Sequence, residues 1–199
     1  MMASINPLGE RARRNRWWHT AAAFTAGCLL GGWALGAGAG AAGLLVAEVA
    51  GVHGASVACR VVLGIALAAG VVELAGWPVP TVHRQVDEAW LGRYRGWVYG
   101  AGFGAQLGAG LATTVTTAAV YATVAMVVLL GAVGRLAEAT AVGTVFGLFR
   151  AVPVLTARRL HDPESLRRRA RLMAAGAMPA RLVSGASLFA LALLTAFLP

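Results

Sequence analysis

Long apolar runs separated by short polar or basic segments dominate the chain. The runs cover residues 20–50, 57–77, 98–134, 138–155 and 182–198. About 20 apolar residues suffice for a helix to cross the hydrocarbon core of a bilayer. The pattern therefore predicts an all-α, polytopic transmembrane helical bundle of about five spans. The two longest runs could each be a tilted helix or two shorter ones.

The segments between the runs carry the signals of membrane interfaces. Pro78-Val79-Pro80 ends the second run, because proline cannot continue a helix. Three aromatic residues that favour the headgroup level follow it: Trp90, Tyr94 and Trp97. Asp162 as N-cap, with Pro163 and Glu164 after it, predicts a short helix over 164–173 on the membrane surface. Its arginines would meet anionic lipid headgroups: Arg167, Arg168, Arg169 and Arg171.

The distribution of arginine predicts how the chain is threaded. Four arginines precede the first run, three lie in 81–96 and seven in 158–181, whereas Arg60 and Arg135 stand alone in the other turns. Cytoplasmic loops carry the excess of basic residues. We therefore expect a multi-pass protein of the cell membrane with a cytoplasmic N-terminus and an outside C-terminus.

Two segments of the chain match each other at a shift of 75 residues. Residues 78–87 share Pro, Val, Thr, Arg and Asp with 153–162, and a shift of 72 aligns Leu35-Gly36-Ala37-Gly38 with Leu107-Gly108-Ala109-Gly110. We interpret the match as a parallel tandem repeat of a two-span unit, followed by a C-terminal helix. The predicted organisation is a basic tail (1–19), repeat unit 1 (20–88), repeat unit 2 (97–164), a basic interfacial segment (165–181) and a last span (182–199).

Composition agrees with a membrane location and argues against nucleic acid as a partner. Hydrophobic residues make up 58% of the chain and charged residues 13%, against about 25% charged in soluble domains. The net charge is +9, and all 17 basic residues are arginine, which with the abundant Ala and Gly is typical of a GC-rich bacterial genome. The arginines flank apolar runs, so membrane topology explains them better than nucleic-acid binding.

Two stripes of residues are candidates for packing and for function. Glycines recur every fourth residue in the first and third runs and predict a glycine zipper between these helices: Gly32, Gly36, Gly40, Gly100, Gly104 and Gly108. A second stripe on the third run is polar and consists of Gln106, Thr113, Thr117 and Tyr121. It either forms hydrogen bonds between helices or lines a path for a solute.

Ionisable residues inside apolar runs are costly and therefore suggest a function. The repeat brings Glu73 close to the level of Arg150. We predict that they form an ion pair near the cytoplasmic side. The alternative is that each side chain extends to the nearby interface.

No motif of an enzyme, a metal site or a cofactor site is present. Cys28 and Cys59 align in the repeat with Gly100 and Gly134, which favours a role as small packing residues. The four histidines have no second histidine at helical spacing, so no metal or cofactor is expected. The sequence does not favour an enzyme.

The glycine-rich stretch GAGFGAQLGAGLATT, residues 100–114, resembles spans of the DsbD/CcdA-type membrane electron carriers. That family moves reducing equivalents through two intramembrane cysteines. The resemblance implies a thiol–disulfide carrier, but no Cys-Pro pair follows either glycine-rich stretch. No residue roles are therefore transferred from the family.

The sequence thus leaves three functions open. The first is a small membrane protein that transports or senses a small solute along the polar stripe. The second is a scaffold or assembly subunit that binds partner helices and lipid, and the third is the thiol–disulfide carrier. The expected partners are the bilayer, its anionic headgroups, and a further copy of the chain or a membrane protein.

Overall fold

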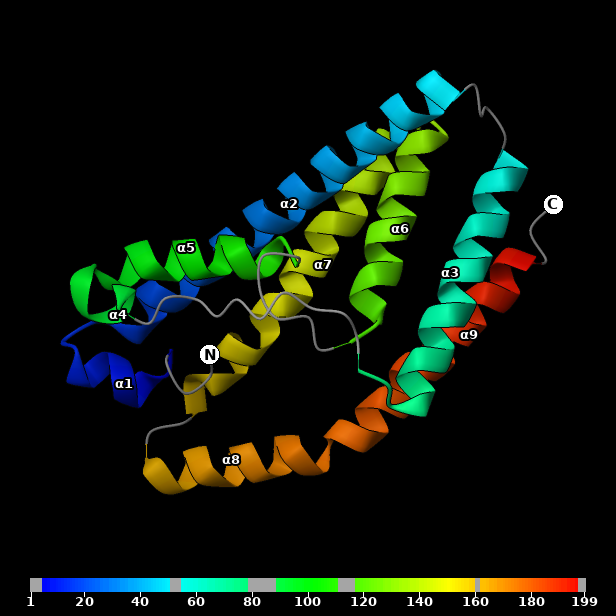
Figure 1. The fold of residues 1–199 in the computed structure, drawn as a ribbon. Coiled ribbons are helices and arrows are strands. Elements are labelled where there is room, and N and C mark those ends of the chain that lie inside the picture. The colour runs from blue at the N-terminus through cyan, green and yellow to red at the C-terminus, as the bar shows by residue number, and fades with distance from the viewer. Residues whose placement is uncertain (1–4, 51–54, 79–88, 111–116, 160–161, 197–199) are drawn as a thin grey trace. The chain divides into compact units, whose positions relative to one another are not determined.

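The described part of the chain is entirely helical (Figure 1). The computed structural model describes residues 5–50, 55–78, 89–110, 117–159 and 162–196. Its α-helices are α1 (Pro7–Ala12), α2 (Trp17–Ala50), α3 (Ala55–Ala75), α4 (Trp90–Arg93), α5 (Gly96–Gly108), α6 (Ala119–Ala132), α7 (Leu136–Thr156), α8 (Pro163–Ala175) and α9 (Ala177–Ala196), and the 3-10 helix η1 (Ala157–Arg159) follows α7. The predicted all-α class is confirmed for these residues.

The chain forms two compact units. Unit 1 comprises Met1–Trp33, His83–Thr114 and Thr144–Gly176, and unit 2 comprises Ala34–Val82, Val115–Gly143 and Ala177–Pro199. The helices α2 and α7 each contribute to both units. The predicted repeat stays a prediction, because 79–88 lies outside the described residues. Of the two aligned prolines, Pro78 follows the end of α3, whereas Pro153 lies inside α7.

Unit 1 is built on the first half of α2. The helix α5 runs parallel to it, because Gly100, Gly104 and Gly108 approach Thr20, Phe24 and Cys28 in the same order. The end of α7 lies near the start of α2, since η1 packs against α1. A cluster of buried apolar side chains fills the unit: Ile5, Ala21, Phe24, Cys28, Tyr99, Phe103, Ala151 and Val154.

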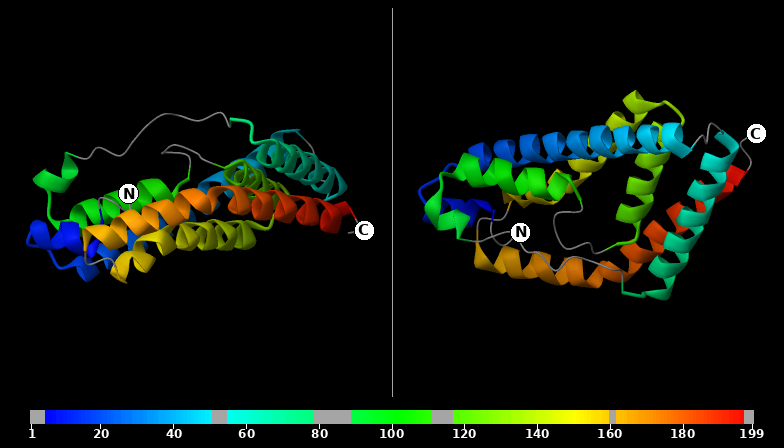
Figure 2. Two further views of the ribbon diagram at one scale, coloured as in Figure 1. Left: turned by 90° about the horizontal axis from the view of Figure 1, so that it is seen from below. Right: turned by 45° about the horizontal axis from the view of Figure 1, so that its top comes forward.

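Unit 2 contains α3, α6, α9 and the facing parts of α2 and α7. The helices α3 and α9 lie side by side in both views of Figure 2. Small residues allow this contact, since Gly70 faces the ring of Phe189 and Gly185 faces Leu74. The start of α7 packs on α2 through Gly36 and Gly40.

The two longest apolar runs fold differently. The first forms the single helix α2, whereas the third is broken into α5 and α6. The break begins at Gly110, whose φ of +72° suits glycine and ends a helix. Gly76 (φ +68°) ends α3 and Gly134 (φ +78°) ends α6 in the same way. The helix of the second run is therefore ended by Gly76, two residues before the predicted Pro78.

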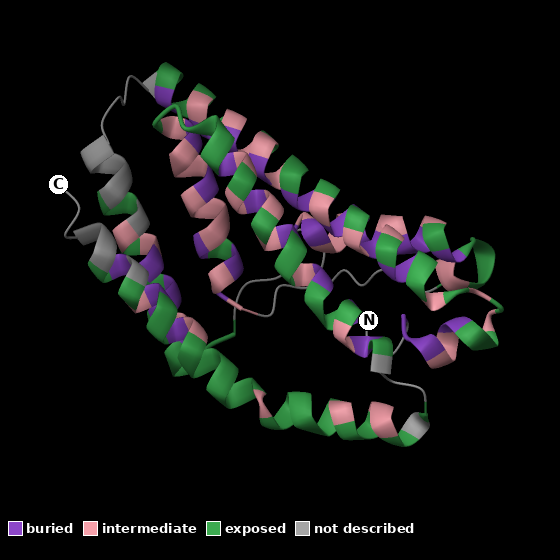
Figure 3. Cartoon of the chain, turned by 180° about the vertical axis from the view of Figure 1, so that it is seen from behind, coloured by how far each residue is buried: buried purple, intermediate pink, exposed green. Residues whose placement is uncertain are grey.

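The prediction of about five spans is not confirmed. Within the described residues, Trp17–Val49 and Leu136–Thr156 are long and apolar enough to cross a membrane. A third span arises if the bent pair α8 and α9, which meet at 46°, counts as one. The exposed faces of α2 and α7 are apolar, as residues Leu30, Trp33, Leu45, Val145, Phe149 and Val152 illustrate. Figure 3 shows exposed and buried stretches alternating along the long helices.

Candidate functional site

Three helices of unit 1 converge on the backbone of Cys28 in α2. Gly108 of α5 and Gly147 of α7 both face the Cys28 carbonyl so closely that a Cβ atom at either position would collide with it. Gly104 of α5 faces the preceding turn, where a Cβ atom would lie 2.9 Å from the Cys28 amide nitrogen. Three glycines therefore bring α5 and α7 to the same level of α2.

Arg150 lies one turn beyond Gly147 on α7 and is the unusual residue of this junction. Its Nε and Nη2 atoms are buried and have no hydrogen-bond partner among the described residues. The guanidinium carbon lies 5.2 Å from the centre of the Phe146 ring, a distance at which a cation is attracted to the ring face.

Arg150 is placed inside the apolar helix rather than at its end. It lies six residues before Thr156, which corresponds to roughly 9 Å along the axis. Its neighbours Ala151 and Val154 are buried in the core of unit 1. An ion in such surroundings is expensive unless it is paired, so an unpaired guanidinium requires a functional explanation.

A buried carboxylate lies in unit 1 at the end where α2 and α5 begin. Glu10 of α1 is fully buried, and its two oxygens accept hydrogen bonds from Tyr99 Oη at 2.5 Å and Thr20 Oγ1 at 2.8 Å. Arg13 Nη1 lies 3.1 Å from Glu10 Oε1 and supplies the counter-charge. Asn15 Nδ2 donates to Tyr99 Oη at 3.3 Å. This network ties α1 to the first turns of α2 and α5.

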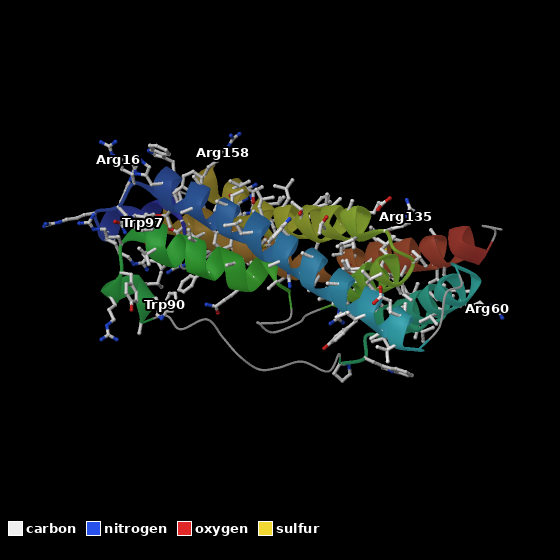
Figure 4. All side chains as sticks on the ribbon, turned by 90° about the horizontal axis from the view of Figure 1, so that it is seen from above. Arg16, Arg60, Trp90, Trp97, Arg135 and Arg158 are labelled. Atoms are coloured by element: carbon white, nitrogen blue, oxygen red, sulfur yellow. The ribbon has the colours of Figure 1, made fainter. Side chains whose placement is uncertain are left out.

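Basic and aromatic side chains surround the same end of unit 1. Figure 4 shows Arg16, Trp97 and Trp90 at this end, and Arg158 follows α7 on the same side. Trp18 and Trp97 are exposed there, as expected of residues at the level of lipid headgroups. Arg169 of α8 donates from Nη2 to Thr156 Oγ1 at 2.7 Å, which fastens α8 to the end of α7.

Unit 2 contains a second buried carboxylate, Glu73 of α3. It is 5% exposed, and its Oε2 accepts a hydrogen bond from the backbone amide of Ala118 at 2.8 Å. Ala118 is the N-cap of α6, so the carboxylate stabilises the positive end of that helix. Glu73 belongs to unit 2 and Arg150 to unit 1, and their ion pair stays a prediction.

The predicted polar stripe does not run along one helix. Gln106 lies on α5, whereas Tyr121 lies on α6 and Thr117 just before it. Thr113 lies outside the described residues. Of the two possibilities left open for the third run, the structure has the broken one, because left-handed Gly110 follows the end of α5. The solute path itself stays a prediction.

Both glycine stripes pack against other helices of the same chain, but only the stripe on α5 faces the predicted helix. Gly100, Gly104 and Gly108 do face α2, and the glycines of α2 that face α5 are Gly27 and Gly31. The α2 stripe of Gly32, Gly36 and Gly40 instead faces α7, at Gly147, Thr140 and Ala139 respectively, and Gly40 also meets Gly131 of α6.

The helix α8, which the sequence predicts to lie on the membrane surface, begins at the predicted cap. Asp162 Oδ1 accepts from the Ser165 amide at 2.7 Å, and Pro163 is the first residue of α8. Of its four predicted headgroup ligands, Arg167, Arg168 and Arg171 are exposed and Arg169 is half-buried. Of the cysteines, Cys28 is buried and free, and the Cys59 side chain lies outside the described residues.

Two features were missed by reasoning from the sequence. The Glu10 network joins α1, α2 and α5 across 89 residues of sequence, so no local pattern reveals it. A weak signal existed, since Asn6-Pro7 followed by Glu10 is a helix start within a basic tail. The pair Gly27 and Gly31 has the spacing of a helix contact and could have been found.

Comparisons with known proteins returned no relationship: no family model, no curated protein and no solved structure matches this chain.

Proposed function

We propose that this chain is a multi-pass protein of the cell membrane, with the basic end of unit 1 on the cytoplasmic side. Its support is the apolar exposed face of the long helices α2 and α7 and the arginines around their adjoining ends. The positive-inside rule assigns such an end to the cytoplasm. The C-terminus, one further span along the chain, would then lie outside.

We further propose that the protein transports or senses a small solute at Arg150. The observation that carries this proposal is the pair of buried, unpartnered nitrogens of Arg150 within an apolar helix. Intramembrane charges without an internal partner are typical of solute and ion pathways. Gln106 of α5 belongs to the same unit and remains a candidate for the wall of the path, whereas Thr117 and Tyr121 belong to unit 2.

Flux into reconstituted vesicles tests this function. Purified protein in proteoliposomes is assayed with a panel of small cationic, neutral and anionic solutes. We expect at least one solute to enter faster than into empty vesicles, and Arg150→Gln to abolish the difference. Arg135→Gln removes the same charge from an exposed position at the other end of α7 and should keep it. If no solute distinguishes Arg150→Gln from the wild type in flux or in binding, the function is wrong.

The scaffold alternative has fewer surfaces available for binding a partner helix. Most of the glycines expected to bind partner helices pack inside the chain, so Gly104→Leu would disrupt the protein itself rather than a partner contact. The surface of α8 remains, where Leu172 is 62% exposed beside its arginines. We propose that this helix contacts anionic lipid in the cytoplasmic leaflet.

The lipid proposal predicts a dependence on headgroup charge. The protein should be more stable to heat in phosphatidylglycerol nanodiscs than in phosphatidylcholine nanodiscs, and less so at high salt. Replacing Arg167, Arg168 and Arg171 by Gln should remove about 1 kcal/mol of lipid attraction per side chain. Arg135→Gln, between α6 and α7, is the control. Equal effects of the triple variant and the control would contradict the proposal.

A further inference from the structure

We infer that the Nε–Nη2 edge of Arg150 binds a small oxyanion group, a carboxylate or a phosphate. The inference rests on the proposed function and names the class of solute that Arg150 receives. It is drawn from the arrangement of donors on the guanidinium and from the charges around it.

The two unpartnered nitrogens form one recognition edge. The Nε–H and the Nη2–H of an arginine point the same way and match the two oxygens of a carboxylate or phosphate. In Arg150 these are the two buried atoms without a partner among the described residues. A halide offers only one acceptor atom to the two donors, whereas a carboxylate or phosphate gives each donor its own oxygen.

The rest of the guanidinium is held by apolar contacts. The Phe146 ring lies near its carbon at 5.2 Å, and the cation–π attraction fixes the group without using its N–H donors. Gly147, one turn earlier on α7, packs closely on Cys28 of α2 and so fixes the helix that carries Arg150. The donor edge is therefore positioned before any ligand binds.

No described carboxylate of unit 1 is free to neutralise Arg150. Glu10 is engaged by Tyr99, Thr20 and Arg13. Asp162 caps α8, and Glu164 is exposed in the first turn of the same helix. Among the described residues of unit 1, no carboxylate pairs with Arg150, so an anion from outside the chain can supply the counter-charge.

The charges at the adjoining end of unit 1 favour anions as well. The end of unit 1 nearest to Arg150 carries Arg11, Arg13, Arg14, Arg16, Arg93, Arg95 and Arg158. A surface of one sign raises the local concentration of oppositely charged solutes. Arg150 then lies roughly 9 Å inside this end, measured along α7.

Binding of defined anions to the protein in phosphatidylcholine nanodiscs tests the inference. Thermal unfolding and calorimetric titration are measured with acetate, inorganic phosphate and chloride at constant ionic strength. We expect acetate or phosphate to bind and stabilise the wild type more than chloride does. Arg150→Gln should weaken that binding roughly 10- to 100-fold, as loss of hydrogen bonds to a charged group does.

Two further variants keep the result interpretable. Arg150→Lys retains the charge but not the two-donor edge, and should bind the oxyanion roughly tenfold more weakly than arginine does. If Arg150→Gln does not fold, Arg150→Lys replaces it as the test variant. Arg135→Gln removes an exposed charge that does not belong to the basic end of unit 1, just before α7 in unit 2, and should bind like the wild type.

The source of the oxyanion is settled by changing the lipid. Arg150-dependent stabilisation in phosphatidylglycerol nanodiscs without added phosphate identifies a lipid headgroup, and stabilisation only by added acetate or phosphate identifies a free solute. Either result supports the inference. If neither medium gives an Arg150-dependent effect, or if Arg150→Lys binds as tightly as the wild type, the inference is overturned. Arg150-dependent uptake or binding of a neutral or cationic solute alone would overturn it and leave the proposed function standing.

Discussion

At the scale of single residues, the two arginines that face buried groups in unit 1 differ in how they are satisfied. Arg13 pairs with the buried Glu10 carboxylate at 3.1 Å, and that carboxylate also accepts two hydroxyl hydrogen bonds. Arg150 has a ring face beside it but no acceptor for two of its nitrogens in the described part of the chain. The first arrangement stabilises the fold, whereas the second holds a charge available for a ligand.

The Glu10 network predicts a cost for removing one hydroxyl. Tyr99→Phe leaves a fully buried carboxylate short of a donor, and we expect a loss of about 1–3 kcal/mol in stability. Thermal unfolding in a mild detergent measures it. Tyr94→Phe is the control, since Tyr94 is 46% exposed. Equal melting temperatures for the two variants would mean that the network contributes nothing to stability.

At the scale of helices, glycine has two separate roles in this chain. At Gly76, Gly110 and Gly134 it adopts a left-handed conformation that ends a helix. At Gly104 and Gly108 it lies within a helix and lets α5 approach α2. The first role sets where helices stop, and the second sets which helices can touch.

A matched pair of substitutions separates a packing glycine from an open one. A Cβ atom at Gly104 would collide with the Phe24 carbonyl, whereas one at Gly38 meets nothing within 4 Å. We expect Gly104→Ala to destabilise the protein by about 1–3 kcal/mol through overpacking. Gly38→Ala should be neutral or stabilise by up to about 1 kcal/mol, because alanine favours the helix. Thermal unfolding measures the stability of both variants. Equal stability of Gly104→Ala and Gly38→Ala would refute the close contact between Gly104 and the Phe24 carbonyl.

At the scale of the whole molecule, the direction of the helices agrees with the distribution of arginine. In unit 1, α5 runs parallel to α2, and η1 at the end of α7 lies against α1. The starts of α2 and α5 and the end of α7 therefore lie together at the basic end of unit 1. Arg135 lies at the other end of α7, next to Glu138, whose Oε1 is 3.0 Å from Arg135 Nη2.

This arrangement predicts which residues are reached from outside the cell. Single cysteines at positions 135 and 158, in a background of Cys28→Ala and Cys59→Ala, are treated with a membrane-impermeant maleimide. Position 135 should be labelled in intact cells, and position 158 only after lysis. A reporter fused after residue 199 should be active outside, because α9 follows α8, for which we propose a cytoplasmic location. Labelling of position 158 in intact cells would reverse the proposed orientation.

The sequence alone determined the class of the protein and most of its helices. Apolar runs, the Asp162–Pro163 helix start and the clustering of arginine are local signals, because they depend on neighbours along the chain. Helicity, the candidate membrane helices and the start of α8 followed from them. The number of spans did not follow, since a run of apolar residues does not show whether left-handed glycine such as Gly110 interrupts the helix.

Only the tertiary structure decided which charges are paired and which are not. Glu10 meets Tyr99 across 89 positions, and Glu73 meets Ala118 across 45. Such partners are brought together by the packing of separate helices, and their spacing in the sequence is arbitrary. The same packing places Arg150 beside Phe146 with two unpartnered donors, which no pattern in the sequence distinguishes from an arginine that extends to the interface.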